Sequence, residues 1–286
     1  MKIKEKTRYD AELQWYVTNR CNMNCHYCFN ANSIAKKFGK IAPINISKLI
    51  RTLDKTNKIF KINFLGGEPF LVPNIVEACI ILTKKHYISF NTNLTSTEVK
   101  KITEKINPAR ISYITASLHI KELEKCNLIN RYIDNFLLCK KKGFNIDAIE
   151  VAHPLLLNEV AKYKTFFKER NIDIKFTAFI GKYNGKKYPE SYTLKELKIF
   201  GIKKNKITIF NQKGKKCNAG YNSGIILPNG NIIRCNQIND KIGNIYKNIT
   251  FENNLFICSS EFCGCPLKMY NKPLFKKALK ETKTSD

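Results

Sequence analysis

The sequence LQWYVTNRCNMNCHYCF, residues 13–29, joins a strand pattern to a cluster of cysteines. Its first five residues, Leu13 to Val17, are rich in aromatic and β-branched side chains, which is typical of a buried β-strand. The chain then enters a C-x3-C-x2-C motif formed by Cys21, Cys25 and Cys28. We therefore expect the three cysteines on a loop at the carboxyl end of a strand.

Strand and helix patterns alternate from this stretch to residue 180. We expect further strands at 59–65, 88–93, 111–118, 146–151 and 174–180, and helices at 47–55, 74–85, 96–106, 121–142 and 159–170. Such alternation predicts βα units around a parallel sheet. The expected fold class is α/β, with a partial (β/α)6 TIM-like barrel over residues 12–180. Side chains that carry chemistry should lie at the carboxyl ends of its strands.

The pattern changes after residue 180. We expect a connector over 181–212, a small β-hairpin-based domain over 213–270 and a basic C-terminal tail over 271–286. The hairpin is predicted by the turn sequence Pro228-Asn229-Gly230-Asn231 between two short apolar runs. It should bring Cys217 and Cys235 to one end of the small domain.

The composition excludes several classes of protein. A hydrophobic fraction of 43% in 286 residues supplies a buried core, which excludes a disordered chain. No apolar run approaches the roughly 20 residues of a membrane span, and the N-terminus has no signal sequence, so we expect a cytoplasmic protein without a membrane partner.

The net charge is +27, but the lysines are spread in twos and threes. This favours a solvated surface, with an anionic substrate or nucleic acid as the alternative, and makes nucleic acid the weaker partner.

Eleven cysteines without an export signal indicate thiol chemistry or metal ligation rather than disulfides. Cys79, Cys126 and Cys139 lie alone in helical patterns, and we expect them to pack as small apolar side chains.

The C-x3-C-x2-C motif has two interpretations. One is a zinc site with His26 as a candidate fourth ligand. The other is a [4Fe–4S] cluster, in which three thiolates leave one iron open to a small molecule.

The chain resembles the radical S-adenosylmethionine (radical SAM) superfamily, whose signature is C-x3-C-x2-C with an aromatic residue before the last cysteine. Cys21, Cys25, Tyr27 and Cys28 match it position by position, and Gly66-Gly67-Glu68-Pro69 resembles the family's GGEP motif. The resemblance implies that S-adenosylmethionine (SAM) chelates the open iron and that Glu68 receives the amino group of SAM. It also implies that an electron from the cluster cleaves SAM to a 5′-deoxyadenosyl radical.

Other strand ends resemble the family less closely. Asn91, Asn93 and Ser117 lie where the family's polar groups reach the ribose and carboxylate of SAM. His119 has three interpretations, as a proton carrier, a contact to SAM or a packed surface histidine, and we favour the last. His153 follows the fifth strand and is a further candidate.

The C-terminal part resembles the SPASM and twitch domains, which hold auxiliary iron–sulfur clusters behind radical SAM barrels. Cys217, twelve residues, Gly230, four residues and Cys235 match the opening of their motif. Only five cysteines remain there, so the shorter twitch form with one second [4Fe–4S] cluster is implied. We expect the ligands Cys217, Cys235, Cys263 and Cys265, with Cys258 as the reserve. A zinc knuckle is the alternative.

The predicted function is that of a radical SAM oxidoreductase in which the auxiliary cluster takes up an electron after hydrogen abstraction from the substrate. Because the cysteine motif begins at residue 21, we expect no N-terminal peptide-recognition domain, which favours a small, carbohydrate-like or nucleotide-like, anionic substrate. Modification of a ribosomally made peptide by crosslinking, epimerisation or oxidation is the alternative. An external low-potential reductant such as flavodoxin or ferredoxin is the expected partner. From another class, the rival is a zinc or iron–sulfur protein that binds nucleic acid without catalysis.

Overall fold

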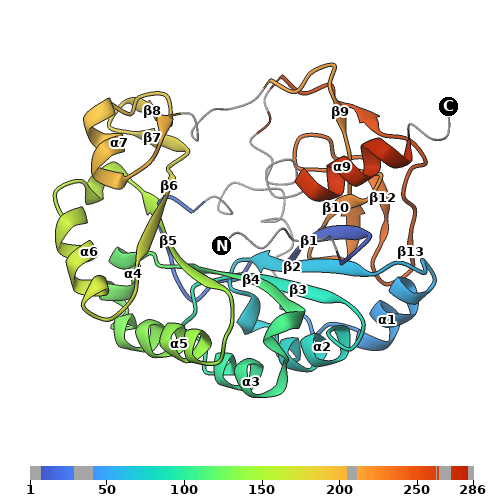
Figure 1. Cartoon of the computed structure of the whole chain (residues 1–286), viewed down its shortest axis with the longest axis horizontal. Helices are drawn as coiled ribbons and strands as arrows, with labels where there is room; N and C mark the ends of the chain where they lie inside the picture. Colours follow the sequence, from blue (N-terminus) through green and yellow to red (C-terminus); the bar gives the residue numbers. More distant parts are fainter. Residues whose placement is uncertain (1–7, 29–40, 205–210, 262, 264–271, 283–286) are drawn as a thin grey trace.

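The structure is a computed structural model that describes residues 8–28, 41–204, 211–261, 263 and 272–282. Six parallel strands form its centre, and each pairs with the next along the chain. Figure 1 shows them as an open arc with the helices on its convex side. The predicted α/β partial barrel is confirmed. The strands are β1 (Ala11–Thr18), β2 (Phe60–Gly66), β3 (Tyr87–Thr92), β4 (Ile111–Ser117), β5 (Ile146–Ala152) and β6 (Ile174–Ala178).

Helices and short 3-10 turns connect these strands. Each predicted helix is present, with ends that differ by a few residues, except for the one that we expected at 121–142. The connecting helices are α1 (Ile46–Asp54), α2 (Ile75–Leu82), α3 (Glu98–Lys105), α4 (Ile120–Lys125), α5 (Ile129–Lys141) and α6 (Val160–Lys168). The 3-10 turns are η3 (Pro69–Leu71), η4 (Pro108–Arg110) and η5 (Pro154–Leu156).

The expected long helix at 121–142 is wrong, because the chain breaks between α4 and α5. Asn127 adopts a left-handed backbone with φ of 55°, a conformation that asparagine tolerates better than most residues. The amide of Leu128 then donates to the carbonyl of Leu123, which closes the end of α4. The break also exposes Cys126, so our expectation that it packs in the core is wrong as well.

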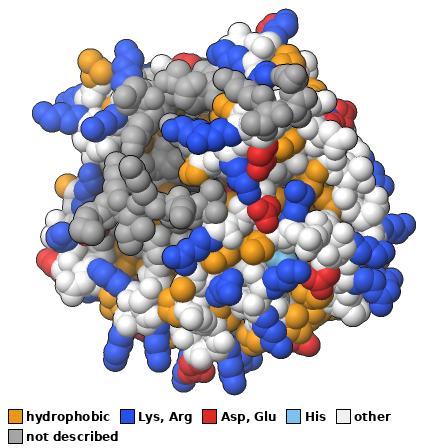
Figure 2. Space-filling model, turned by 45° about the vertical axis from the view of Figure 1, so that its right-hand side comes forward, with side chains coloured by type: hydrophobic (Ala, Val, Ile, Leu, Met, Phe, Trp, Pro, Cys, Tyr) orange, Lys and Arg blue, Asp and Glu red, His pale blue; other side chains and the backbone are white. Residues whose placement is uncertain are grey.

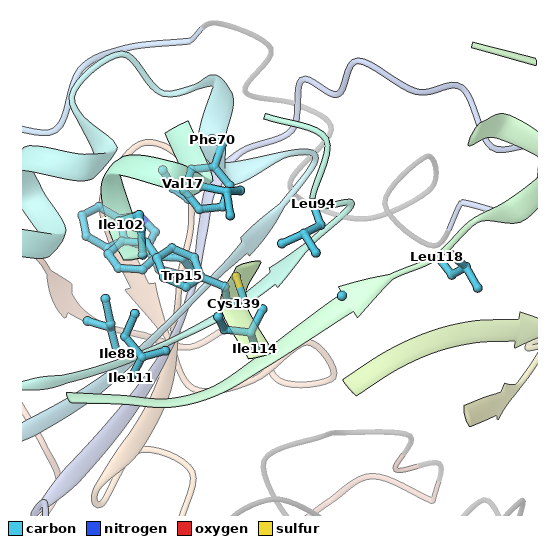
Figure 3. Close-up of a cluster of buried hydrophobic side chains, with 14 of the residues drawn as sticks. Trp15, Val17, Phe70, Ile88, Leu94, Ile102, Ile111, Ile114, Leu118 and Cys139 are labelled. Carbon is cyan, nitrogen blue, oxygen red and sulfur yellow. The ribbon is translucent and has the colours of Figure 1, made fainter. Parts of the chain in front are cut away.

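The core lies between the convex face of the sheet and the helices. Trp15, Phe64 and Phe90 are register partners on β1, β2 and β3, and neighbouring rings stack with centroids 5.6 and 5.5 Å apart. Burial of each such side chain contributes about 1.5–3 kcal/mol to folding. Figure 3 shows Cys139 of α5 among these apolar side chains, and Cys79 of α2 is buried too. The apolar roles expected for these two cysteines are confirmed.

Alternate residues of each strand point to opposite sides of the sheet, and the concave face carries a set of polar side chains on its first three strands. Gln14 of β1, Asn63 of β2 and Ser89 of β3 are buried and linked in a chain of hydrogen bonds. The Asn63 amide donates to Gln14 Oε1 over 2.6 Å, and the Ser89 hydroxyl donates to Asn63 Oδ1 over 2.9 Å. The inside of the barrel therefore includes hydrogen-bonding groups on β1, β2 and β3.

The C-terminal hairpin continues the sheet of the barrel. Strand β10 (Ser223–Ile226) pairs in parallel with β1 and antiparallel with β11 (Asn231–Ile233). Gly230 turns between them with φ of 82°, as the turn sequence predicts. The sheet order is β13-β12-β11-β10-β1-β2-β3-β4-β5-β6, with β12 at Lys241–Asn244 and β13 at Asn248–Ile249.

The remaining elements lie at the two ends of the arc. One end carries β7 (Gly181–Tyr183), β8 (Lys186–Tyr188) and α7 (Leu194–Phe200), within the predicted connector. At the other end, β9 (Lys216–Cys217) pairs with β14 (Phe256–Ile257). Helix α9 (Lys272–Glu281) covers most of the range that we expected as a basic tail.

The surface agrees with the scattered lysines of the sequence. Figure 2 shows Lys and Arg side chains distributed over the visible face among acidic and uncharged residues. None of the helices in the described ranges has the length and apolar character that a membrane crossing requires.

Candidate functional site

The cysteine loop after β1 packs directly against the Gly66-Gly67-Glu68-Pro69 turn after β2. The Gly67 amide donates to the Thr18 carbonyl over 2.8 Å, and the Glu68 amide donates to the Arg20 carbonyl over 2.9 Å. A Cβ on Gly66 would lie 2.0 Å from Thr18 O, and one on Gly67 would lie 2.0 Å from Arg20 O. Only glycine fits here, so the two motifs that the sequence analysis singled out form one structure at the mouth of the barrel.

The three thiols of the loop lie close enough for the charge of one to affect the pKa of another. The Cys28 amide donates to the Cys25 carbonyl over 3.0 Å, which closes a turn between them, and the Met23 amide donates to Cys21 Sγ over 3.4 Å. Burial raises the pKa of the Cys25 thiol, and the negative charges of Glu122 and of the other two thiolates raise it further. The pKa of Cys21 is also raised, first by burial.

The charges in this loop decide which kind of metal site it fits. Three thiolates beside carboxylates repel one another, so the charged form needs bound cations. Iron in a cubane supplies them and separates the sulfurs, because each thiolate binds a different iron. A single zinc would draw its sulfur ligands to about 2.3 Å from one point. In the part of the chain that the structure describes, no three Cys, His, Asp or Glu side chains are arranged to hold a single ion.

Glu68 is buried at the junction of the two loops. Its carboxylate accepts hydrogen bonds from the Thr92 hydroxyl (2.7 Å) and from the amides of Asn93 (2.8 Å) and Phe70 (3.1 Å). Burial raises the pKa of Glu68 to about 7, although these three hydrogen bonds favour its charged form. The carboxylate therefore joins the ends of β2 and β3 and lies close enough to Cys21 for its charge to raise that thiol's pKa. Sequence reasoning did not identify Thr92, a common residue in strands.

Of the polar residues expected at strand ends, Asn93 contacts the cysteine loop. Its amide nitrogen donates to Asn22 Oδ1 over 2.7 Å and lies 3.9 Å from Cys21 Sγ. Asn91 is exposed and Ser117 is half-buried. Within the described residues, no side-chain hydrogen bond joins Asn91 or Ser117 to the cysteine loop, so their roles toward SAM stay predictions.

Tyr27 is held by two residues from other strand ends. Its hydroxyl lies 3.2 Å from His119 Nδ1 and 3.4 Å from Glu150 Oε1. Glu150 is fully buried and also accepts from the Ile120 amide over 2.8 Å. Burial raises the pKa of Glu150 to about 7 and lowers that of His119 to about 4. His119 is thus a half-buried partner of Tyr27 rather than the surface histidine that we favoured.

Glu150 was missed by sequence reasoning although a signal was present. It occupies the same face of β5 as Ala148 and Ala152, which are buried against the helices. A carboxylate on the apolar register of a buried strand is unusual and calls for a partner. The chain supplies Tyr27 from 123 positions away.

Two further histidines pack beside Tyr27. The His153 ring lies 4.7 Å from the His26 ring and 5.4 Å from the Tyr27 ring, measured between centroids. His153 Nδ1 accepts from the Leu155 amide over 3.2 Å, so this residue caps η5. His26 thus contacts aromatic rings, and its expected alternative role as a fourth zinc ligand gains no support.

A second group of cysteines gathers beside β10 and β11. The thiols of Cys235, Cys258 and Cys263 are all close enough to raise the pKa of Cys217, although burial is the largest cause. Cys235 and Cys258 are buried, and Cys217 and Cys263 are half-buried. Each of the ten cysteines in the described ranges is a thiol rather than half of a disulfide. Cys265, another expected ligand, lies outside the described residues.

Short backbone contacts bring these cysteines together. Cys217 on β9 pairs with Phe256 on β14, and the Cys258 amide donates to the Lys215 carbonyl over 3.0 Å. Cys235 ends the hairpin, where its sulfur accepts from the Ile238 amide over 3.3 Å. Tyr16 of β1 packs in the same small apolar cluster as Cys235. The first cysteine group therefore follows β1 directly, and the second packs with Tyr16 of β1.

These observations define a class: an α/β half-barrel that carries an open trio of thiols at its mouth and a second, more buried set of thiols beside its first strand. The model of the radical SAM superfamily matches residues 15–163, which is just over half of the chain. The chain belongs to the radical SAM superfamily, and the expected resemblance is confirmed.

Similar curated proteins match parts of the chain. An uncharacterized protein of Methanocaldococcus jannaschii is 34% identical over 122 residues, which are 41% of this chain and 40% of that protein. GTP 3′,8-cyclase of Mycobacterium marinum is 31% identical over 30% of this chain and 25% of the cyclase. GTP 3′,8-cyclase of Clostridium acetobutylicum is 25% identical over 73% of this chain and 72% of the cyclase. The chain thus spans less than half the length of the first two relatives.

Solved structures share the fold. The structure of anSMEcpe with bound AdoMet matches with a TM-score of 0.58 and 18% identity, over 82% of this chain and 78% of that one. Streptococcus suis SuiB bound to its precursor peptide SuiA matches with a TM-score of 0.55 and 19% identity, over 84% of this chain and 63% of SuiB. Each match covers more of this chain than residues 12–180, so the shared fold includes part of the chain after the barrel.

Proposed function

We propose that this radical SAM enzyme is an oxidoreductase with two [4Fe–4S] clusters. Cys21, Cys25 and Cys28 would hold the cluster that binds SAM. Cys217, Cys235 and Cys263, three of the four expected ligands, would hold the auxiliary cluster together with the reserve Cys258, which lies close to Cys217 and which we propose in place of Cys265. The observation that carries the proposal is the convergence of both thiol groups on β1, one after its end and one against Tyr16.

When bound by these thiols, the first cluster would supply one electron, taken from an external low-potential reductant, for the cleavage of SAM to methionine and a 5′-deoxyadenosyl radical. The chain's own residues would position SAM. Glu68 offers a carboxylate to the SAM amino group, with its orientation fixed by Thr92 and Asn93. Asn93 holds the loop of Cys21 through Asn22. Asn91 and Ser117 lie near the carboxyl ends of β3 and β4, and we propose them as further contacts to SAM.

The second thiol group suits an electron acceptor. After the adenosyl radical has taken a hydrogen atom from the substrate, loss of one proton and one electron completes a two-electron oxidation. Four cysteine ligands would leave the auxiliary cluster without an open iron, and it would accept this electron. Tyr16 of β1 and Leu65 of β2 pack in the same apolar cluster as the thiols. An electron that leaves the barrel interior for the auxiliary cluster would therefore pass through protein rather than water.

The substrate that we favour is small and nucleotide-like. Two features support this: the polar lining of the barrel, and relatives that are GTP 3′,8-cyclases. Amide and hydroxyl groups such as Asn63 and Ser89 match the hydrogen-bonding needs of sugars and bases. Modification of a peptide is the second candidate, favoured by the fold shared with SuiB, whose structure contains a precursor peptide.

Anaerobic reconstitution tests the proposal. Two clusters predict roughly eight iron atoms per chain, four in each cubane. Addition of SAM and a strong reductant should then yield 5′-deoxyadenosine. A chain that binds zinc and leaves SAM intact would exclude the proposed chemistry.

The substrate class is tested separately by hydrogen transfer. We expect deuterium to pass from a ring-deuterated nucleoside triphosphate to 5′-deoxyadenosine, together with consumption of the nucleotide. A control reaction contains peptides made from short open reading frames beside the gene. Deuterium transfer from a peptide alone would reverse the order of the two candidates.

A further inference from the structure

Arg234 is a buried charge immediately before Cys235, in the second thiol group. Only 5% of the residue is exposed, on a chain whose other basic side chains are mostly at the surface. Removing a guanidinium from water is costly unless its donors find partners. The contacts of Arg234 therefore show which parts of the chain its buried guanidinium connects.

The guanidinium connects the segments that carry the cysteines. Its Nη1 donates over 3.0 Å to the carbonyl of Ala219, two residues after Cys217. Its Cζ lies 4.1 Å from the ring centroid of Phe256, two residues before Cys258. Because Arg234 itself adjoins Cys235, one side chain contacts or adjoins three segments that each carry a thiol of the group.

Acidic residues hold the guanidinium in this position. Glu252 accepts two hydrogen bonds, from Nη2 and from Nη1, the latter over 2.7 Å. Asp240 Oδ2 lies 3.5 Å from Nε, and its backbone carbonyl accepts from the Arg234 amide over 2.9 Å. A two-pronged pair of this kind requires the planar fork of arginine, which lysine lacks.

The loop between Cys217 and β10 is shaped around this side chain. Gly220 has φ of 90°, and a Cβ there would lie 2.5 Å from Arg234 Nη1. The Gly220 carbonyl accepts from the Glu252 amide over 2.9 Å. Glycine thus admits the guanidinium and lets the loop reach the residue that binds it.

We infer that Arg234 is the positioning residue of the auxiliary site: it holds the segments of Cys217, Cys235 and Cys258 in the arrangement that accepts the second cluster. This inference rests on the proposed function, because it concerns the cluster assigned to these thiols. Because Arg234 adjoins Cys235, its loss should also alter the surroundings of that cluster and therefore its reduction potential.

The experiment isolates the second site by replacing Cys21, Cys25 and Cys28 with alanine in every protein used. Iron content and the electron paramagnetic resonance spectrum of the reduced protein then report the auxiliary cluster alone. We expect roughly four iron atoms per chain in this background. Adding Arg234→Met should reduce the iron to less than about a quarter of that amount. Adding Arg234→Lys should restore part of the iron, with an altered spectrum and a changed midpoint potential.

Arg170→Met is the control for the loss of an arginine away from the cysteines. Arg170 also lies over an aromatic ring, 3.8 Å from the Phe166 centroid, and beside a carboxylate, Glu169, but it follows α6 far along the chain from the cysteines. Its replacement should leave iron content, spectrum and potential unchanged. Full iron with the parent spectrum and potential in Arg234→Met would overturn the inference.

A second variant keeps the inference testable if Arg234→Met does not fold. Glu252→Gln leaves the arginine in place but removes the charge that holds its fork, so we expect less iron and an altered spectrum. An unchanged spectrum and potential in Glu252→Gln would also count against the positioning role. If the parent background itself binds no iron, the auxiliary cluster of the proposed function is wrong, and the inference fails with it.

Discussion

The two thiol groups use the same side chain in opposite surroundings. Cys21 and Cys28 are exposed on a loop at the open mouth of the barrel. Cys235 and Cys258 are buried, and Cys235 packs with Ile225 among apolar side chains. With two exposed thiols and the half-buried Cys25, the first group leaves room for a molecule to approach, whereas the second group, with two buried and two half-buried thiols, leaves less. The contrast supports our proposal that the first site binds a cosubstrate and that the second transfers electrons.

The two groups are also positioned by different forces. The first loop is held by backbone hydrogen bonds to the Gly66-Gly67 turn, where only glycine allows the approach. The second group is held by short strand pairs and by the side chain of Arg234. Damage to the first site should therefore follow from backbone crowding, and damage to the second from the loss of a side chain.

The largest expected difference between the sites comes from removing one thiol of each. Cys28→Ala leaves the first cluster with two ligands, so we expect SAM cleavage to fall by more than about a thousandfold, because the radical cannot form. Cys235→Ala should leave SAM cleavage within roughly threefold of the parent and abolish the oxidised product. Chromatography of 5′-deoxyadenosine and product, from the same reactions, measures both.

Cys126→Ala is the control for these two variants, since Cys126 is exposed and distant in sequence from both groups. It should retain cleavage and product. If Cys235→Ala formed product at the parent rate, the division of labour between the two sites would be wrong.

The sequence predicted the first site more fully than the second. The C-x3-C-x2-C motif follows β1 and the GGEP turn follows β2. Because these neighbouring strands are parallel, their carboxyl ends meet at one edge of the sheet. The contact between Gly67 and Thr18 follows from that topology. Long-range partners such as Glu150 were not predictable, because a hydrogen bond across 123 positions leaves little trace in either local pattern.

The C-terminal part shows the other limit of sequence reasoning. The turn at Gly230 was predicted from its residues, but the parallel pairing of β10 with β1 was not, because no local pattern encodes which strand edge a hairpin will meet. Arg234 resembled any other basic residue of a lysine-rich chain. Its burial depends on Glu252 and on the glycine at 220, which become neighbours only in the folded protein.

The next effect in size concerns the backbone packing of the first site. Gly67→Ala would place a methyl group 2.0 Å from the Arg20 carbonyl oxygen, so the cysteine loop must move. We expect a loss of about 2–4 kcal/mol in the free energy of unfolding and the loss of about half of the bound iron. Urea titration and iron analysis measure the two effects.

Gly143→Ala is the comparison for this substitution. Gly143 also has a positive φ, of 81°, but nothing lies within 4 Å of a Cβ there. Only the backbone strain remains, about 1–2 kcal/mol, and both clusters should stay bound. Equal iron loss in the two variants would show that glycine at 67 matters for chain stability rather than for the position of the loop.

The smallest expected effect is a difference in acid sensitivity. All four histidines lie outside the second thiol group, and His153 beside Tyr27 has a pKa lowered to about 4, first by burial and then by His26. Its ring is neutral in the folded chain, whereas the unfolded chain binds a proton near the ordinary pKa of 6.5. The stability that depends on the neutral ring is therefore complete above pH 6.5 and is lost as the pH falls toward 4.

His153→Asn isolates this contribution, because asparagine can still cap η5 but does not titrate. The variant should be less stable than the parent at pH 7.5, since it lacks the ring contacts, and the deficit should shrink by about 1–2 kcal/mol at pH 5. Ile233→Ala, in the apolar cluster of the second thiol group, should show the same deficit at both pH values. If the His153→Asn deficit also stayed constant in urea titrations, acid sensitivity would not distinguish the two regions.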